Sequence, residues 1–273
     1  MFGRRNIAAI VAEFLGTGVL TLLVLNVQRS TIGVPFFIAL AAGLAVAMVS
    51  FAVAGTSGGH FNPALTFGLW TARKITSIRA VFYIGVQLLG GWGAYGLYTY
   101  FINTTLAPPL KDGFTTHALV GEAVGAFIFT FGWSAAMYQR FNPAVRASIA
   151  GLSLTVGIIA VSSASLGLLN PAVALGVRAW VLGSYVAGPV IGAIIGVNLY
   201  KYLFAPSVEK DVIVDGAVVL AGVSSSSVAA VGTTKASAAA KAVTVRKPRT
   251  VVKPAKVVAD KKTTVVTKTR RKK

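Results

Sequence analysis

The chain carries one pattern twice, and this repetition limits the folds that it can adopt. Glu13 and Glu122 each lie within an apolar run, with Gly three residues and Thr eight residues further on. Asn-Pro-Ala begins at Asn62, 49 residues after the first glutamate, and at Asn170, 48 residues after the second. The chain is therefore an internal duplication, in which each half has one glutamate and one Asn-Pro-Ala in the same phase.

A third Asn-Pro-Ala begins at Asn142, only 20 residues after the second glutamate, and is out of phase with the repeat. Asn is a favoured N-cap, and Pro suits the first position of a helix because its missing N–H is not needed there. We interpret this triplet as the start of an ordinary helix.

Long apolar segments recur along the first three quarters of the chain. Of the 273 residues, 55% are hydrophobic and 12% are charged, which is unusual for a soluble domain. An apolar run of about 20 residues is long enough to cross the hydrocarbon core of a bilayer. We expect six membrane-spanning helices, over residues 7–27, 35–54, 80–101, 117–138, 144–164 and 180–204.

The connections between these segments alternate in charge. Up to residue 206 there are eleven Lys and Arg residues, of which eight fall at one set of connections and ends and three at the other. The positive-inside rule then predicts that both termini are cytoplasmic. The chain has no cysteine, which excludes disulfides and thiol chemistry.

The last part of the chain, residues 207–273, has a different composition. It holds fifteen Lys and Arg residues and four acids, a net +11 of the total +19. It has no apolar periodicity and is expected to be a disordered cytoplasmic tail. Only the segment 212–220, which contains Asp-Gly, suits a short hairpin.

Each in-phase Asn-Pro-Ala lies between an irregular stretch and a short apolar run, so we expect a half-helix to begin at each Asn. Three spans and one half-helix make an odd-numbered unit, so the second copy must be inverted in the membrane. Irregular backbone at membrane depth persists only where protein buries it or where it lines a wet cavity. The two half-helices should therefore meet, N-terminus to N-terminus, near the middle of the membrane.

Over residues 7–204 the chain resembles the aquaporin, or major intrinsic protein, family. The features that carry the resemblance are Ser-Gly-Gly-His-Phe-Asn-Pro-Ala-Leu-Thr at residues 57–66, the second Asn-Pro-Ala, both Glu-led spans, Gln87 and Gly188-Pro189. The resemblance implies an all-α membrane fold of six transmembrane helices and two re-entrant half-helices. It implies a channel domain of residues 1–206, with repeats at about 7–101 and 117–204, and a homotetramer.

The resemblance places a pore at the two triplets, which are Asn62, Pro63 and Ala64, and Asn170, Pro171 and Ala172. Each Asn oxygen would cap its helix, and each Asn NH2 would donate into the pore. Two positive helix ends at the pore centre disfavour cations, which is the established explanation of cation exclusion in aquaporin-type channels.

Ionisable groups inside apolar spans are costly and usually functional, so Glu13 and Glu122 have two interpretations. One is proton relay. The other, which the resemblance favours, is loop support, in which each carboxylate accepts N–H groups from the loop before its half-helix. His60 resembles the pore-wall histidine of the family, whose backbone carbonyl accepts from passing solute. We expect no metal and no cofactor.

Four positions line the narrowest part of the pore in this family, and their offsets from the two asparagines place them at Ala42, Ile158, Gly167 and Val173. The last position is usually Arg. These residues predict a wide, apolar and uncharged constriction. Arg178, two helical turns further out, is an alternative source of the missing charge.

The expected function is water conduction, with small neutral solutes such as glycerol, urea or ammonia left open. Ala174 stands where glycerol facilitators typically have Asp, which favours water. The alternative is a non-conducting membrane scaffold whose basic tail binds anionic lipid or nucleic acid. The chain shows no nucleophile–base set, phosphate loop or metal-ligand spacing, so we do not expect an enzyme.

Overall fold

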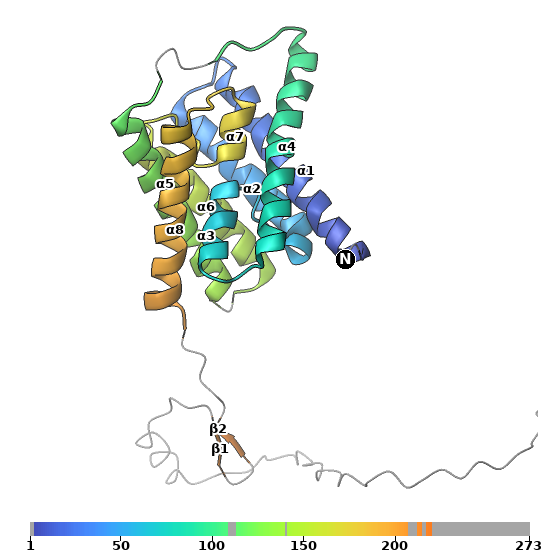
Figure 1. Ribbon diagram of the computed structural model, residues 1–273, viewed down its shortest axis with the longest axis vertical. Helices are drawn as coiled ribbons and strands as arrows, with labels where there is room; N and C mark the ends of the chain where they lie inside the picture. Colours follow the sequence, from blue (N-terminus) through green and yellow to red (C-terminus); the bar gives the residue numbers. More distant parts are fainter. Residues whose placement is uncertain (1–2, 109–112, 140, 207–211, 215–216, 220–273) are drawn as a thin grey trace, which may run out of the picture. The chain divides into compact units, whose positions relative to one another are not determined.

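The computed structural model describes residues 3–108, 113–139, 141–206, 212–214 and 217–219. The chain divides into two compact units, Met1–Val208 and Glu209–Lys273. The first unit is a bundle of helices (Figure 1).

Six helical segments of the bundle are long and apolar enough to cross a membrane. The predicted spans are confirmed, with ends that differ by a few residues. The first five are single helices: α1 (Arg4–Gln28), α2 (Pro35–Ser57), α4 (Ser77–Ile102), α5 (Thr116–Tyr138) and α6 (Pro143–Val161). The sixth runs through three consecutive parts: η1 (Leu182–Ala187), α8 (Gly188–Leu199) and η2 (Tyr200–Phe204).

The sixth span contains wider π-helical turns, which the sequence pattern does not predict. The first of these, η1, lies directly before Gly188-Pro189. Proline has no N–H, so Pro189 cannot donate to the carbonyl four residues earlier, and its ring crowds that carbonyl. A local π-helical turn is one way in which a membrane helix satisfies the backbone groups that such an interruption frees.

Two short helices lie inside the bundle, where Figure 1 shows α7 above α3 between the longer helices. They are α3 (Pro63–Thr71) and α7 (Pro171–Gly176), and each begins with the Pro of an in-phase triplet. Both end in the same backbone motif, with an Arg of positive φ, Arg73 or Arg178, just after the last turn. The two half-helices thus begin with the same residues and end in the same backbone motif.

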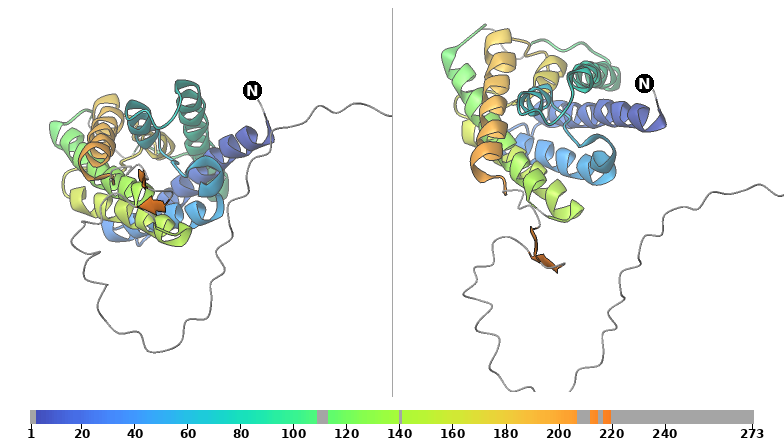
Figure 2. Two further views of the ribbon diagram at one scale, coloured as in Figure 1. Left: turned by 90° about the horizontal axis from the view of Figure 1, so that it is seen from below. Right: turned by 60° about the horizontal axis from the view of Figure 1, so that its bottom comes forward.

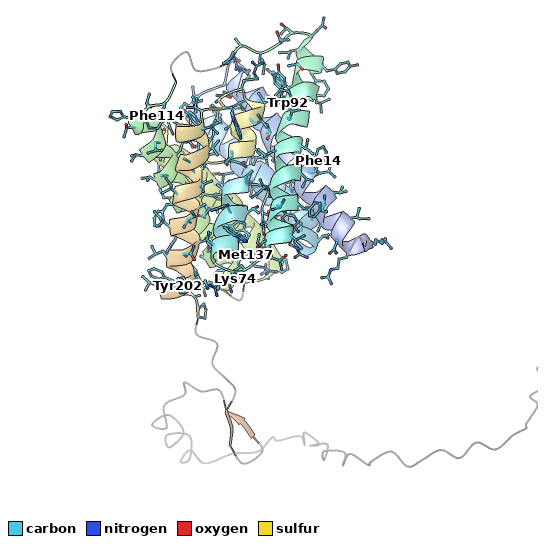
Figure 3. The ribbon with its side chains drawn as sticks, viewed as in Figure 1. Phe14, Lys74, Trp92, Phe114, Met137 and Tyr202 are labelled. Carbon is cyan, nitrogen blue, oxygen red and sulfur yellow. The ribbon has the colours of Figure 1, made fainter. Side chains whose placement is uncertain are left out.

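The second half of the bundle is inverted relative to the first. α1 begins at the lower end in Figure 1, where the chain starts, whereas α5 begins at the upper end, beside Phe114 in Figure 3. Within the halves, α1 packs against α4 and α5 against α8; across them, α2 packs against α6. Figure 2 shows the same bundle from below and tilted.

The triplet at 142 is a helix start, as predicted. Asn142 caps α6, and its Oδ1 accepts from the Val145 N–H at 3.0 Å. Both residues are exposed, so this triplet lies apart from the buried pair.

In the second unit, β1 (Val212–Val214) and β2 (Ala217–Val219) form an antiparallel pair in which Val212 lies opposite Val219. This agrees with the hairpin predicted at 212–220, whose Asp-Gly turn is outside the described residues. The predicted disorder of 207–273 likewise concerns residues that the structure does not describe, apart from these strands.

Candidate functional site

The site is built around the two buried asparagines that begin α3 and α7. Asn62 Oδ1 accepts from the N–H groups of Ala64 at 2.8 Å and Leu65 at 3.4 Å. Asn170 Oδ1 accepts from Ala172 at 3.0 Å and from the next residue at 3.4 Å. Each side-chain oxygen therefore occupies the first free N–H groups of its half-helix, which are the positive end of the helix dipole.

The same two side chains join the halves of the chain. Asn62 Nδ2 donates to the Leu169 carbonyl at 2.9 Å, and Asn170 Nδ2 donates to the Phe61 carbonyl, also at 2.9 Å. Each carbonyl belongs to the residue just before the opposite asparagine. An amide nitrogen carries two hydrogens, so one hydrogen of each asparagine holds the other half and one remains for a further acceptor. The prediction that each Asn NH2 group donates into a pore can therefore apply to only one of its two hydrogens.

Phe61 and Leu169 have positive φ angles, 47° and 52°, which non-glycine residues rarely adopt. Each is held on both sides, because its N–H donates to a glutamate and its carbonyl accepts from the asparagine of the opposite half. Strained backbone of this kind persists only where its surroundings fix it. The reciprocal bonds thus explain how two irregular loops keep one conformation.

The two glutamates are fully buried, one beneath each loop. Glu13 accepts from the N–H groups of His60 at 3.0 Å and Phe61 at 2.7 Å. Glu122 accepts from Leu168 at 2.9 Å and Leu169 at 2.6 Å. Every one of these four bonds satisfies a loop N–H that would otherwise be buried without a partner. The geometry is that of loop support, with both oxygens of each carboxylate in use.

A side-chain network extends from Glu13 toward α4. Gln87 Nε2 donates to Glu13 at 2.8 Å and to Thr66 Oγ1 at 3.0 Å, and His60 Nδ1 lies 3.1 Å from the same hydroxyl. The His60 ring also stands edge-on to Tyr83, with ring centroids 5.2 Å apart. The imidazole is therefore fixed by its neighbours, and the pore-wall role of the His60 backbone carbonyl stays a prediction.

The four predicted constriction residues line one small cavity that has room for about one water (about 10 Å³). The cavity is lined by Leu20, Val24, Ile38, Ala42, Leu154, Ile158, Gly167, Leu168 and Val173. The side chains that line it are apolar, and its volume is small; that these four residues form a wide constriction of a pore stays a prediction. Branched side chains from α1 and α6 occupy space that the absence of an aromatic residue and an Arg would otherwise leave open.

Arg178 does not line this cavity. Its Nη1 donates to the Tyr95 hydroxyl at 3.1 Å and to the Leu106 carbonyl at 3.4 Å. The guanidinium is thus directed toward α4 and the segment after it. Among the residues that the structure describes, no cluster of three or more His, Cys, Asp or Glu side chains could hold a metal ion.

Sequence reasoning missed two parts of the site. The first is the bond from each asparagine to the opposite half, for which a single sequence gives no signal. The second is the contribution of α1 to the cavity at the predicted constriction residues. Leu20 and Val24 lie seven and eleven residues after Glu13, which places all three on one helix face, so this face was recognisable from the pattern.

Comparisons with known proteins agree with this architecture. The family described as major intrinsic protein matches residues 3–200. The chain is 31% identical to Aquaporin Z of Photorhabdus laumondii over 72% of this chain and 97% of that protein. It is 30% identical to the probable aquaporin PIP2-6 of rice, Oryza sativa, over 74% and 83%. The X-ray structure of the aquaglyceroporin from Plasmodium falciparum superposes with a TM-score of 0.62 at 22% identity, over 74% of this chain and 98% of that one.

Proposed function

Because the chain belongs to the major intrinsic protein family, whose members are channels and not enzymes, we propose that it conducts water passively down an osmotic gradient. The observation that carries this proposal is the meeting of two capped half-helices, each of which leaves one Asn hydrogen for a further acceptor. Two fixed donors suit the oxygen of a single water molecule. The positive ends of α3 and α7 face the same point and disfavour cations, protons included.

Water is favoured over larger solutes by the size of the constriction. A cavity with room for about one water, lined mostly by apolar groups, offers glycerol too little space and few hydrogen-bond partners. Several aquaporins are among the relatives, and the superposed structure is that of an aquaglyceroporin, so both transport classes occur in the comparison set. We place this chain with the water channels and expect glycerol and urea to pass slowly.

The test is osmotic shrinkage of proteoliposomes, with glycerol uptake measured on the same vesicles. The wild-type chain should accelerate shrinkage well beyond that of empty liposomes and leave glycerol uptake near the empty-liposome rate. Leu154→Ala should raise glycerol uptake, because it removes a branched side chain from the constriction. Val173→Arg should lower water permeability, because a guanidinium would fill a cavity of this size. Shrinkage no faster than in empty vesicles would refute the channel proposal.

The third triplet supplies a matched control. Asn142→Ser changes an Asn-Pro-Ala that caps an exposed helix end and retains a capping side chain. It should leave water permeability unchanged, whereas Asn62→Leu or Asn170→Leu should reduce it strongly. Equal losses from all three would mean that stability, and not the pore, is being measured.

We also propose that both termini are cytoplasmic. In the described part of the bundle, seven of nine Lys and Arg residues lie at the end where α1, α4 and α6 begin, as the positive-inside rule requires of a cytoplasmic face. Since the chain has no cysteine, Gly3→Cys and Thr104→Cys can each be labelled from outside intact cells with an impermeant maleimide. Only Thr104→Cys should react. Tetramerisation is expected from the family.

A further inference from the structure

A groove lies between the first turns of α1 and α4, away from the channel. Its volume is about 170 Å³, and it is lined by Asn6, Ala9, Ile10, Thr76, Ile78, Arg79, Phe82 and Tyr83. Ile78 and Phe82 are 59% and 40% exposed, so the groove opens to the outside of the bundle. Enclosed small-molecule sites are usually larger, at about 300–1,000 Å³. The dimensions suit part of a ligand whose remainder lies outside the groove.

The groove has an apolar wall and one cation. Ile10, Ile78 and Phe82 supply the wall, and Arg79 supplies the charge. Within the described residues, the Arg79 guanidinium forms no hydrogen bond or ion pair, and its central carbon lies 6.0 Å from the centroid of the Tyr83 ring. A guanidinium has five donors in a fixed fork that matches phosphate oxygens. This one is available to a ligand.

No acidic side chain on the described surface could pair with Arg79. The two acids among the described residues are Glu13 and Glu122, and both are fully buried. The same end of the bundle carries further Lys and Arg residues, among them Lys74, which Figure 3 labels there. The field at this end is therefore positive and favours an anionic partner.

The floor of the groove is rigid. Tyr83 is 2% exposed, and its hydroxyl donates to the Ser57 carbonyl at 2.8 Å. Thr76 caps α4 by accepting from the Arg79 N–H at 3.4 Å. The backbone that presents the guanidinium is thus fixed at the helix start, while the side chain extends from it.

We propose that this groove binds one anionic glycerophospholipid of the surrounding leaflet, with its phosphate on Arg79 and part of an acyl chain along Ile10, Ile78 and Phe82. The position at the end of a membrane-spanning bundle brings lipid headgroups to this height. Basic pockets between transmembrane helices are recognised sites for anionic headgroups. A phospholipid can pair its phosphate with Arg79 and also cover the apolar wall with an acyl chain. A soluble anion could do only the first, and an apolar molecule only the second.

The test measures binding of a fluorescent phosphatidylglycerol, and of the matching phosphatidylcholine, to the full-length protein in detergent. Measurement at about 1 M salt, where the Debye length is about 3 Å, suppresses attraction to the basic residues 207–273. The wild type should prefer phosphatidylglycerol. Arg79→Ala should weaken its binding about tenfold, which is the scale of one charge-assisted hydrogen bond. Arg79→Lys should retain part of the preference, and Ile10→Trp should block both lipids by filling the groove.

Arg146→Ala is the matched control, because Arg146 lies at the same end of the bundle, near the start of α6, but outside the groove. It should bind both lipids like the wild type. Water permeability of the Arg79 variants, which lie away from the pore, checks that they are folded. Equal binding of the two lipids, unchanged binding in Arg79→Ala, or equal losses in Arg79→Ala and Arg146→Ala would each overturn the proposal.

Discussion

In the first half of the bundle, the Glu13 carboxylate joins two elements, because it accepts from loop N–H groups and also from the Gln87 side chain of α4 at 2.8 Å. In the second half, the hydrogen bonds to Glu122 come from the loop that precedes α7, including the N–H groups of Leu168 and Leu169. The glutamate of the first half is therefore bonded to a neighbouring helix through Gln87, whereas the second loop is tied to the sixth span by Tyr185, whose hydroxyl accepts from the Leu166 N–H at 3.3 Å.

The second half also has several close approaches between its helices. Gly188, Gly192 and Gly196 lie four residues apart on α8, and a Cβ added to each would overlap a backbone carbonyl oxygen of α5. Small residues with this spacing let membrane helices approach backbone to backbone. In the first half, Gly90 makes the comparable approach to α1, at the Phe14 carbonyl. The two duplicated halves thus differ in degree: the first has the additional bond from Gln87 to its glutamate, and the second has three consecutive glycine contacts between α8 and α5.

The largest expected effect comes from removing the carboxylates. Glu122→Ala leaves two buried loop N–H groups without an acceptor, which costs about 1–3 kcal/mol for each group. Glu13→Ala also removes an acceptor of the Gln87 side chain, so we expect it to lose more unfolding free energy than Glu122→Ala does. Unfolding of the purified protein in detergent mixed with SDS would measure both. Equal losses would show that the Gln87 bond contributes nothing and that the halves are equivalent.

The next effect tests the packing of the second half. Gly192→Ala places a methyl group against the Ala123 carbonyl oxygen, closer than van der Waals contact allows, and should lower the free energy of unfolding by about 1–3 kcal/mol, as overpacking usually does. Gly85→Ala, on α4, is the control because an added Cβ meets nothing within 4 Å. It should be neutral or slightly stabilising, since Ala favours helix. A tolerated Gly192→Ala would mean that α8 moves freely on α5.

Much of this arrangement was predictable from the sequence, for a physical reason. Membrane spans must bury about 20 apolar residues and satisfy their own backbone groups, so the six spans and the two capped half-helices follow from local composition. The phase of Glu13 with Asn62, and of Glu122 with Asn170, identified the partners within each half. Local composition and the spacing of residues along the chain can both be read from a single sequence.

Features that depend on which side chains meet in space were not predictable. The cavity at the four expected constriction positions is also lined by Leu20, Val24 and Leu154; the sequence pattern indicates which face of α1 Leu20 and Val24 share, but not how far their side chains fill the space between the helices. The π-helical turns of the sixth span and the bonds from each asparagine to the opposite loop likewise require the assembled bundle.

A smaller effect isolates the side-chain tie of the first half. Gln87→Met keeps the size of the side chain but removes its bonds to Glu13 and Thr66, so we expect a loss of about 1–2 kcal/mol in unfolding free energy. Combined with Glu13→Gln, the losses should be non-additive because the residues are in contact. Combined with Glu122→Gln, they should add, since that pair shares no partner. Non-additivity with both glutamates would contradict the separation of the halves.

The smallest effect concerns the one feature in which the halves are alike. Serine caps a helix about as well as asparagine, so Asn62→Ser and Asn170→Ser remove only the donors to Leu169 and Phe61. Both bonds measure 2.9 Å between buried groups, so each variant should lose about 1 kcal/mol of unfolding free energy. The two losses should be equal although the halves are stabilised differently, because each asparagine fixes the loop of the opposite half. Unequal losses would show that the stabilisation behind each loop, by Gln87 or by the α8 glycines, determines how much its reciprocal bond is worth.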